Sequence, residues 1–152
     1  TALLLTEEDL SWMPSQMPQG LVALNASPRS VLASSSDIVT QFVEAAIDDG
    51  LQRLTRHYAA AGLPCAETAL DDDALVQWLV EERMDEVVCA YAPMGPTRLR
   101  LRALRQSLAC KGISLRMQMR DYDRLVWPHA NRGFFQLGKR IPEFLDIMRG
   151  GQ

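Results

Sequence analysis

The sequence contains few cysteines and no long hydrophobic run. Its three cysteines, Cys65, Cys89 and Cys110, are an odd number, are widely spaced and form no CxxC pair, which argues against a disulfide framework and a zinc site. We therefore expect buried, reduced thiols in a cytoplasmic protein. No apolar run approaches the roughly 20 residues of a membrane span. Residues 1–10 lack the basic region and the apolar length of a signal peptide.

Several motifs of nucleotide and hydrolase chemistry are also missing from the sequence. No GxGxxG follows the first predicted strand, and neither GxxxxGK[ST] nor GxSxG occurs. Their absence argues against the dinucleotide fingerprint, the P-loop and the nucleophile elbow. Asp9 follows the first strand as a phosphoacceptor aspartate would, but the matching lysine near the last strand is missing. His57, on the long helix beside Tyr58, is interpreted as a surface or hydrogen-bonded residue, and His129, in the aromatic tail, as a structural or interface residue.

The charged residues are distributed unevenly along the chain. Residues 1–95 carry 4 basic and 15 acidic side chains, whereas residues 96–152 carry 12 basic and 4 acidic side chains. Such a split predicts either two faces of opposite sign or mutual neutralisation within one fold, and a basic face can meet an acidic partner or a nucleic acid. The run of three acidic residues at 71–73 is interpreted as the N-terminus of a helix rather than as a metal site, because carboxylates favour the positive end of the helix dipole.

The most informative stretch covers residues 85–120. Residues 85–92 form an apolar run typical of a strand buried on both faces, and Pro93, Gly95 and Pro96 end it. An amphipathic helix follows, with Leu99, Leu101, Leu104 and Leu108 on its expected apolar side and Gly112 at its end. Residues 113–120 alternate apolar and polar side chains, as in a strand near a sheet edge. A helical connection of this length predicts two parallel strands with a right-handed crossover.

The rest of the chain extends this pattern. Further strands are predicted at residues 1–5, 21–26 and 65–70, a long helix follows the second strand, and a shorter one occupies residues 74–83. The long helix has a predicted core stripe at Ile38, Phe42, Val43, Ile47, Leu51, Leu54 and Tyr58. The fold class is therefore α/β, a doubly wound, five-stranded parallel sheet with helices on both faces, Rossmann-like or flavodoxin-like. Residues 1–152 are expected to form one domain, excised from a longer chain.

The order of short motifs resembles the N-terminal α/β domain of DNA photolyases and cryptochromes. The resemblance covers residues 21–145, and it rests on Gly62-Leu63-Pro64, Tyr91-Ala92-Pro93, Arg98, Gly112-Ile113, Asp123, Leu125, Pro128 and Gly133-Phe134-Phe135. The chain departs from the family at residues 7–11, where Glu-Glu-Asp-Leu-Ser replaces Arg-Arg-Asp-Leu-Arg. It also carries Leu99 where the family often has an acid. The helical domain that holds FAD in this family is absent.

This resemblance implies an α/β domain that docks on the FAD-binding helical domain of a photolyase-like flavoprotein, related to deoxyribodipyrimidine photolyase. The chain by itself is not expected to be catalytic, although its parent would be a DNA photolyase, a carbon–carbon lyase that supplies any contact with DNA. The domain can hold an antenna chromophore, a folate or a deazaflavin. Trp127, Phe134 and Phe135 would serve the flavin-domain interface, and the excised domain can also pair with a second copy.

Candidate residues for the antenna site follow from the predicted sheet. Ligands of such folds bind at the carboxyl ends of the strands, where the strand order reverses. The candidates are the residues at the ends of the predicted strands and the arginine at the start of the helix that begins near residue 97. They are Thr6, Glu7, Asn25, Ser27, Tyr91 and Arg98.

Two other functions remain open from the sequence. One is a self-standing nucleotide-binding or regulatory domain of the flavodoxin-like or stress-protein type. Its phosphate loop would be residues 93–97, but two prolines there remove amide donors. The other is a DNA-binding module that uses the arginines between Arg98 and Arg120. It ranks last because positions 98, 100, 102 and 105 are expected to spread around the helix.

Overall fold

The computed structural model describes residues 1–26, 37–131 and 133–150. Within it the chain forms two compact units, unit 1 at residues 1–118 and unit 2 at residues 119–152. Ser27, one of the predicted site residues, lies outside the described residues.

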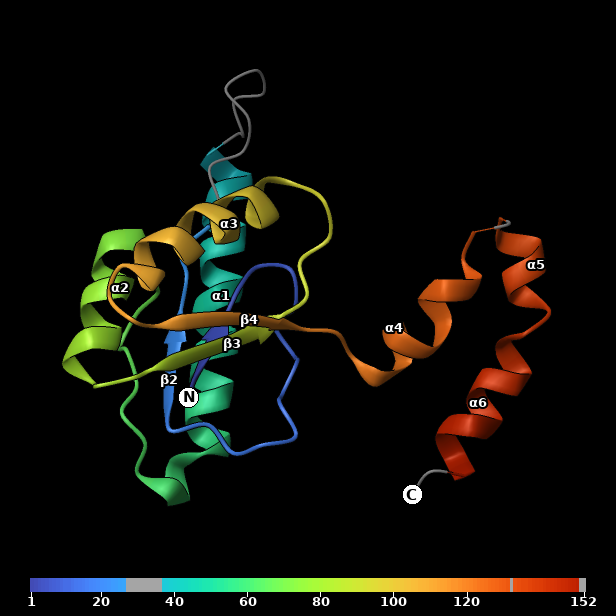
Figure 1. The fold of residues 1–152 in the computed structure, drawn as a ribbon, viewed down its shortest axis with the longest axis horizontal. Coiled ribbons are helices and arrows are strands. Elements are labelled where there is room, and N and C mark those ends of the chain that lie inside the picture. The colour runs from blue at the N-terminus through green and yellow to red at the C-terminus, as the bar shows by residue number, and fades with distance from the viewer. Residues whose placement is uncertain (27–36, 132, 151–152) are drawn as a thin grey trace. The chain divides into compact units, whose positions relative to one another are not determined.

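Unit 1 is built on a parallel sheet (Figure 1). Its strands are β1 (Ala2–Leu5), β2 (Gly20–Ala23), β3 (Glu86–Ala90) and β4 (Ser114–Gln118), in the order β2-β1-β3-β4. Every pairing is parallel. The α/β class and the parallel sheet are therefore confirmed, as is the position of β4 at an edge. The strand order reverses between β1 and β3, which makes the carboxyl ends of these strands the topological switch point.

The prediction of five strands is not confirmed, because the described residues form a sheet of four. The segment expected as the remaining strand touches β2 and the residue after it through two isolated parallel bridges, Leu21 to Cys65 and Leu24 to Leu70. From Cys65 to Leu70 the segment advances five residues, whereas its partner advances three, from Leu21 to Leu24. Two residues of the segment are therefore extra and cannot pair in a regular ladder. The segment therefore bends at Glu67 and Thr68 between the bridges.

Helices cover both faces of the sheet. Helix α1 (Asp37–His57) packs Ile47, Leu51 and Leu54 on the face that carries Leu3, Leu5, Leu21, Ala23, Val88 and Ala90. Helices α2 (Asp72–Glu81) and α3 (Pro96–Ala109) pack on the opposite face, which carries Ala2, Leu4, Val22, Val87 and Cys89. Alternate residues of each strand enter alternate cores, so β1 and β3 are apolar on both sides.

The predicted core stripe of α1 is only partly correct. Ile38 and Phe42 are 77% and 72% exposed, whereas Ile47, Leu51 and Leu54 are buried. The reason is length: 21 residues of helix extend about 31 Å, and strands of four or five residues extend only about 13–17 Å. The first turns of α1 therefore project beyond the carboxyl ends of the strands.

Gly50, in the interior of α1, is a point of close packing. Gly50 is buried, and a Cβ atom placed there would lie 2.9 Å from Leu5 Cδ2 of β1. Glycine costs about 1 kcal/mol of helix propensity relative to alanine, but here it allows the helix to approach the sheet closely. After α1, a 3-10 turn, η1 (Ala59–Ala61), ends at Gly62 in the left-handed conformation, with φ 60°.

Unit 2 is helical, with α4 (Asp121–Val126), a 3-10 turn η2 (Trp127–His129), α5 (Phe134–Gly138) and α6 (Ile141–Gly150). Phe144 of α6 is 1% exposed and stacks on His129, with ring centroids 5.4 Å apart. Trp127 and Phe135 are exposed, and the side chain of Phe134 lies outside the description. His129 thus has the structural role that the sequence predicted.

The three cysteines are free, as expected, but they are not all buried. Cys89 on β3 is fully buried, and burial raises the pKa of its thiol to about 12. Cys65 is partly exposed, and Cys110 is exposed just after the end of α3. No helix among the described residues is long and apolar enough to span a membrane.

Candidate functional site

The carboxyl ends of β1, β2 and β3 carry the candidate site. Thr6 and Glu7 follow β1, Asn25 lies two residues after β2, and Tyr91 follows β3. Because the strands are parallel, all of these residues lie at one edge of the sheet. Helix α3 begins at the same edge, since it follows β3 directly, and it brings Arg98 there. Five of the six predicted site residues are therefore placed at this edge.

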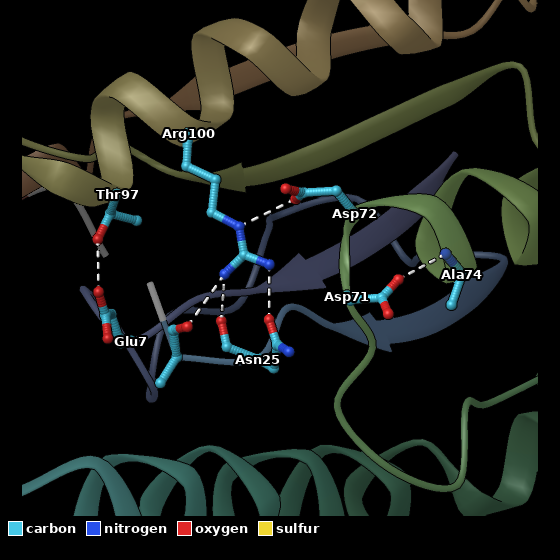
Figure 2. Close-up of polar contacts among 8 residues, drawn as sticks. Glu7, Asn25, Asp71, Asp72, Ala74, Thr97 and Arg100 are labelled. Carbon is cyan, nitrogen blue, oxygen red and sulfur yellow. Dashed lines mark hydrogen bonds and ion pairs between the residues drawn. The ribbon is translucent and has the colours of Figure 1, made fainter. Parts of the chain in front are cut away.

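Two of the predicted residues, Glu7 and Asn25, each accept a hydrogen bond from a side chain of α3, Thr97 and Arg100 respectively (Figure 2). Arg98, also on α3, contacts another predicted residue, because its guanidinium carbon lies 4.8 Å from the centroid of the Tyr91 ring. Its Nη1 atom also donates to the carbonyl of Ala92 at 3.0 Å. This arrangement places a cation over an aromatic face at the end of β3.

Arg100 links the ends of two elements to α3. Its guanidinium donates to the carbonyl oxygen and to Oδ1 of Asn25, each at 2.6 Å, and to Asp72 Oδ1 at 2.9 Å (Figure 2). The side chain is only 11% exposed. Sequence analysis missed this role and considered Arg100 only as one of the arginines of a DNA-binding module. A buried guanidinium needs several acceptors, and no local pattern indicates which carbonyl groups will supply them.

The acidic residues 71–73 have the capping role that the sequence predicted. Asp71 is the N-cap of α2, and its carboxylate accepts a hydrogen bond from the backbone N–H of Ala74 at 2.8 Å. Asp72, in the first turn, pairs with Arg100. The first turn of α2 thus contributes both a helix cap and part of the polar cluster.

Thr97 is the second residue that sequence analysis missed. It is 1% exposed, and its hydroxyl donates to Glu7 Oε1 at 2.7 Å (Figure 2). A signal was present, because Thr97 continues the buried stripe formed by Leu101, Leu104 and Leu108. The sequence analysis gave that place to Leu99, which is 60% exposed. A polar residue at a core position of a helix indicates a buried hydrogen bond.

Two polar atoms at this edge are buried and have no hydrogen-bond partner among the described residues, Thr6 Oγ1 and Glu7 Oε2. Most buried polar atoms in proteins are paired, because an unpaired one costs about 1–3 kcal/mol. An ionised carboxylate oxygen accepts hydrogen bonds and cannot donate one, whereas the hydroxyl can donate or accept. Together they fit a bound group that presents at least one N–H or O–H donor.

The start of α3 is poorly suited to phosphate. Pro96, the first helical residue, has no N–H, and the carboxylate of Glu7 lies against Thr97 in the same turn. Phosphate binding at a helix N-terminus depends on free amides and on the absence of competing negative charge. The local chemistry favours an uncharged group with N–H donors over an anion.

Comparison of the chain with protein-family models, with curated proteins and with solved structures found no match, so the function is argued from this geometry.

Proposed function

We propose that unit 1 is an α/β domain of the photolyase and cryptochrome type that binds an antenna chromophore, a folate or a deazaflavin, at the carboxyl edge of β1, β2 and β3. In this proposal the domain docks on the FAD-binding helical domain of a photolyase-like parent. Catalysis and DNA contact belong to that parent, and the site residues are Thr6, Glu7, Asn25, Tyr91 and Arg98.

The observation that carries the proposal is the pair of buried oxygens, Thr6 Oγ1 and Glu7 Oε2, to which no residue in the described ranges 1–26, 37–131 and 133–150 is hydrogen-bonded. They lie directly after β1, beside the point where the strand order reverses. Ligands of open α/β sheets bind outside the carboxyl ends of the strands at this point. A pterin or a deazaflavin ring offers N–H groups to the carboxylate, and the Tyr91–Arg98 pair offers a surface on which such a ring can stack.

The docking part of the proposal is supported by apolar side chains at the same end of unit 1. Ile38 and Phe42 project on the first turns of α1, Met94 lies between β3 and α3, and Leu99 lies near the start of α3; all four are exposed. Exposed apolar side chains at one end of a domain are suited to contact with a partner. A partner domain that docks at the carboxyl ends of the strands would also cover a chromophore bound there.

The proposal is tested by chromophore binding. The purified protein is examined for absorbance between 350 and 450 nm and then titrated with a folate and with a deazaflavin. Glu7→Gln keeps the shape of the side chain but places an amide where the ligand needs an acceptor. We expect it to weaken binding about tenfold or more, the range for hydrogen bonds to charged groups.

The matched control is Glu8→Gln, which removes one negative charge from the exposed neighbouring residue. The Glu8→Gln variant should bind the chromophore with the same affinity as the unmutated chain. Equal affinity of the Glu7→Gln variant and the unmutated chain would contradict the proposal. Tight binding of ATP or AMP by calorimetry, without binding of either chromophore, would favour a nucleotide-binding regulatory domain instead.

A further inference from the structure

No strand among the described residues lies beside the outer edge of β4, so this edge carries backbone groups outside the sheet's ladder. Ser114 N–H donates to the carbonyl of Asp85, and Gln118 C=O accepts from Tyr91 N–H. Residues 114, 116 and 118 therefore direct their backbone groups toward β3, and the alternation of a strand turns those of Leu115 and Met117 outward. β4 is the last strand in the order of the sheet.

One of these outward groups is covered by α3. Arg105 donates from Nη2 to the carbonyl of Leu115 at 3.0 Å. Among the described residues, the N–H groups of Leu115 and Met117 and the carbonyl of Met117 have no backbone partner. An open edge of this kind is a template for another strand, and natural proteins often guard such edges with charged side chains.

Three arginines of α3 line this edge. Arg98, Arg102 and Arg105 are spaced by four and three residues, so they share one flank of the helix. Arg98 approaches Met117 Sδ at 3.4 Å, and Arg105 reaches Leu115, which places this flank along β4. The four arginines thus do not form a single stripe, as expected, because Arg100 lies on another side of the helix, but the other three share one flank, which the sequence analysis did not predict.

The flank formed by Arg98, Arg102 and Arg105, the arginine flank, is not neutralised within the part of the chain that the structure describes. None of the three forms an ion pair with a described carboxylate, whereas Arg100 pairs with Asp72 and Arg116 with Glu86. Arg102 and Arg105 are exposed. Three adjacent positive charges without counter-charges attract an acidic partner.

We propose that the β4 edge and the arginine flank bind an extended acidic segment of a partner protein, which adds to the sheet as a strand beside β4. The outward N–H and C=O groups would pair with the backbone of that segment, the recognition mode called β-augmentation. Arg98 and Arg105 are about 10 Å apart along α3, and alternate residues of a strand repeat about every 7 Å. Two or three carboxylates at alternate positions can therefore reach the flank. The occupant is proposed to be a polypeptide because an extended backbone presents N–H and C=O groups in turn, which matches the outward N–H and carbonyl of Met117.

The test uses a fluorescein-labelled ten-residue peptide of alternating Glu and Val. Fluorescence anisotropy should show binding that weakens as salt is raised. Arg102 contacts no described residue through an ion pair or side-chain hydrogen bond, so its variants should fold normally. We expect Arg102→Gln to weaken binding about threefold and Arg102→Glu about tenfold, as for partly exposed ion pairs. Arg56→Gln, a charge change at an exposed arginine of α1, should leave binding unchanged.

Two further probes identify the mode of binding. A peptide methylated on alternate backbone nitrogens keeps its charges but cannot pair as a strand, and it should bind at least about tenfold more weakly. Hydrogen exchange at Met117 should be fast in the free protein and slow with the peptide bound. The proposal is overturned if the methylated peptide binds equally well, if Met117 is already protected, if the peptide does not bind, or if single-stranded poly-dT binds more tightly.

Discussion

Arg100 and Arg102 lie two residues apart on α3 and have opposite surroundings. Arg100 is almost buried and donates to Asn25 and Asp72. Arg102 is exposed and has no counter-charge among the described residues. A rotation of about 200° around the helix separates a guanidinium that ties α3 to β2 and α2 from one that faces solvent along the β4 edge. The same residue type thus serves the fold on one flank and can serve recognition on the other.

The largest effect is expected at Arg100. Replacing it by Met removes the donors to Asn25 and Asp72 and leaves their oxygens partly buried without partners. We expect Arg100→Met to lower the free energy of unfolding by about 2–4 kcal/mol, measured by urea denaturation. Asp72→Asn, which retains an acceptor oxygen, should cost clearly less. A loss below 0.5 kcal/mol for Arg100→Met would remove the contrast with Arg102.

Thr97 gives the next largest effect. Thr97→Val keeps the shape of the buried side chain but removes the donor to Glu7 Oε1. The carboxylate then loses a partner, and we expect unfolding to become easier by about 1–2 kcal/mol. Thr97→Ser keeps the hydroxyl and separates the hydrogen bond from the packing of the methyl group. If the Val variant proves as stable as the parent protein, Glu7 is not held in the way the structure describes.

The ion pair between Arg116 and Glu86 is partly exposed, so its surroundings are intermediate between those of Arg100 and Arg102. Hydrogen bonding to Arg116 holds the pKa of the Glu86 carboxyl below its ordinary value of 4.5. The stability that this pair contributes is therefore present above about pH 4.5 and is lost as the pH falls below it. Because both side chains are partly exposed, the contribution should stay below about 1 kcal/mol. Urea midpoints between pH 6 and pH 3 should fall less steeply for Arg116→Gln than for the parent protein.

The smallest effect is expected at Arg102. Arg102→Gln removes an exposed charge and no described contact, so the free energy of unfolding should change by less than about 0.5 kcal/mol. The same urea experiment measures it, with Arg100→Met alongside. A large destabilisation would mean that Arg102 supports the fold and would weaken the contrast between the two flanks.

Short-range patterns predicted much of unit 1 correctly. The apolar run before Pro93 became β3, the alternating residues after Gly112 became β4, and Asp71 became a helix cap. Each of these predictions depends on neighbours within a few residues. The remaining strand, expected at residues 65–70, failed because pairing depends on register with β2, where five steps meet three. The core stripe of α1 failed at Ile38 and Phe42 because helix and strand lengths do not match.

The candidate site was predictable only in part, for a related reason. Residues that follow parallel strands share one edge, so Thr6, Glu7, Asn25 and Tyr91 could be placed from the order of elements alone. The residues that hold them, Thr97 and Arg100, depend on how α3 is rotated over the sheet. That rotation follows from the packing of the whole buried stripe and not from any one residue.

The sequence by itself determined the α/β class, the parallel direction of the strands and the edge position of β4, because periodicity and connection length are local properties. Only the tertiary structure decided which arginine is buried, which oxygens lack partners and which flank of α3 lies along β4. These depend on contacts such as that between Arg100 and Asn25, separated by 75 residues in the chain. Their geometry exists only when the helices pack on the sheet.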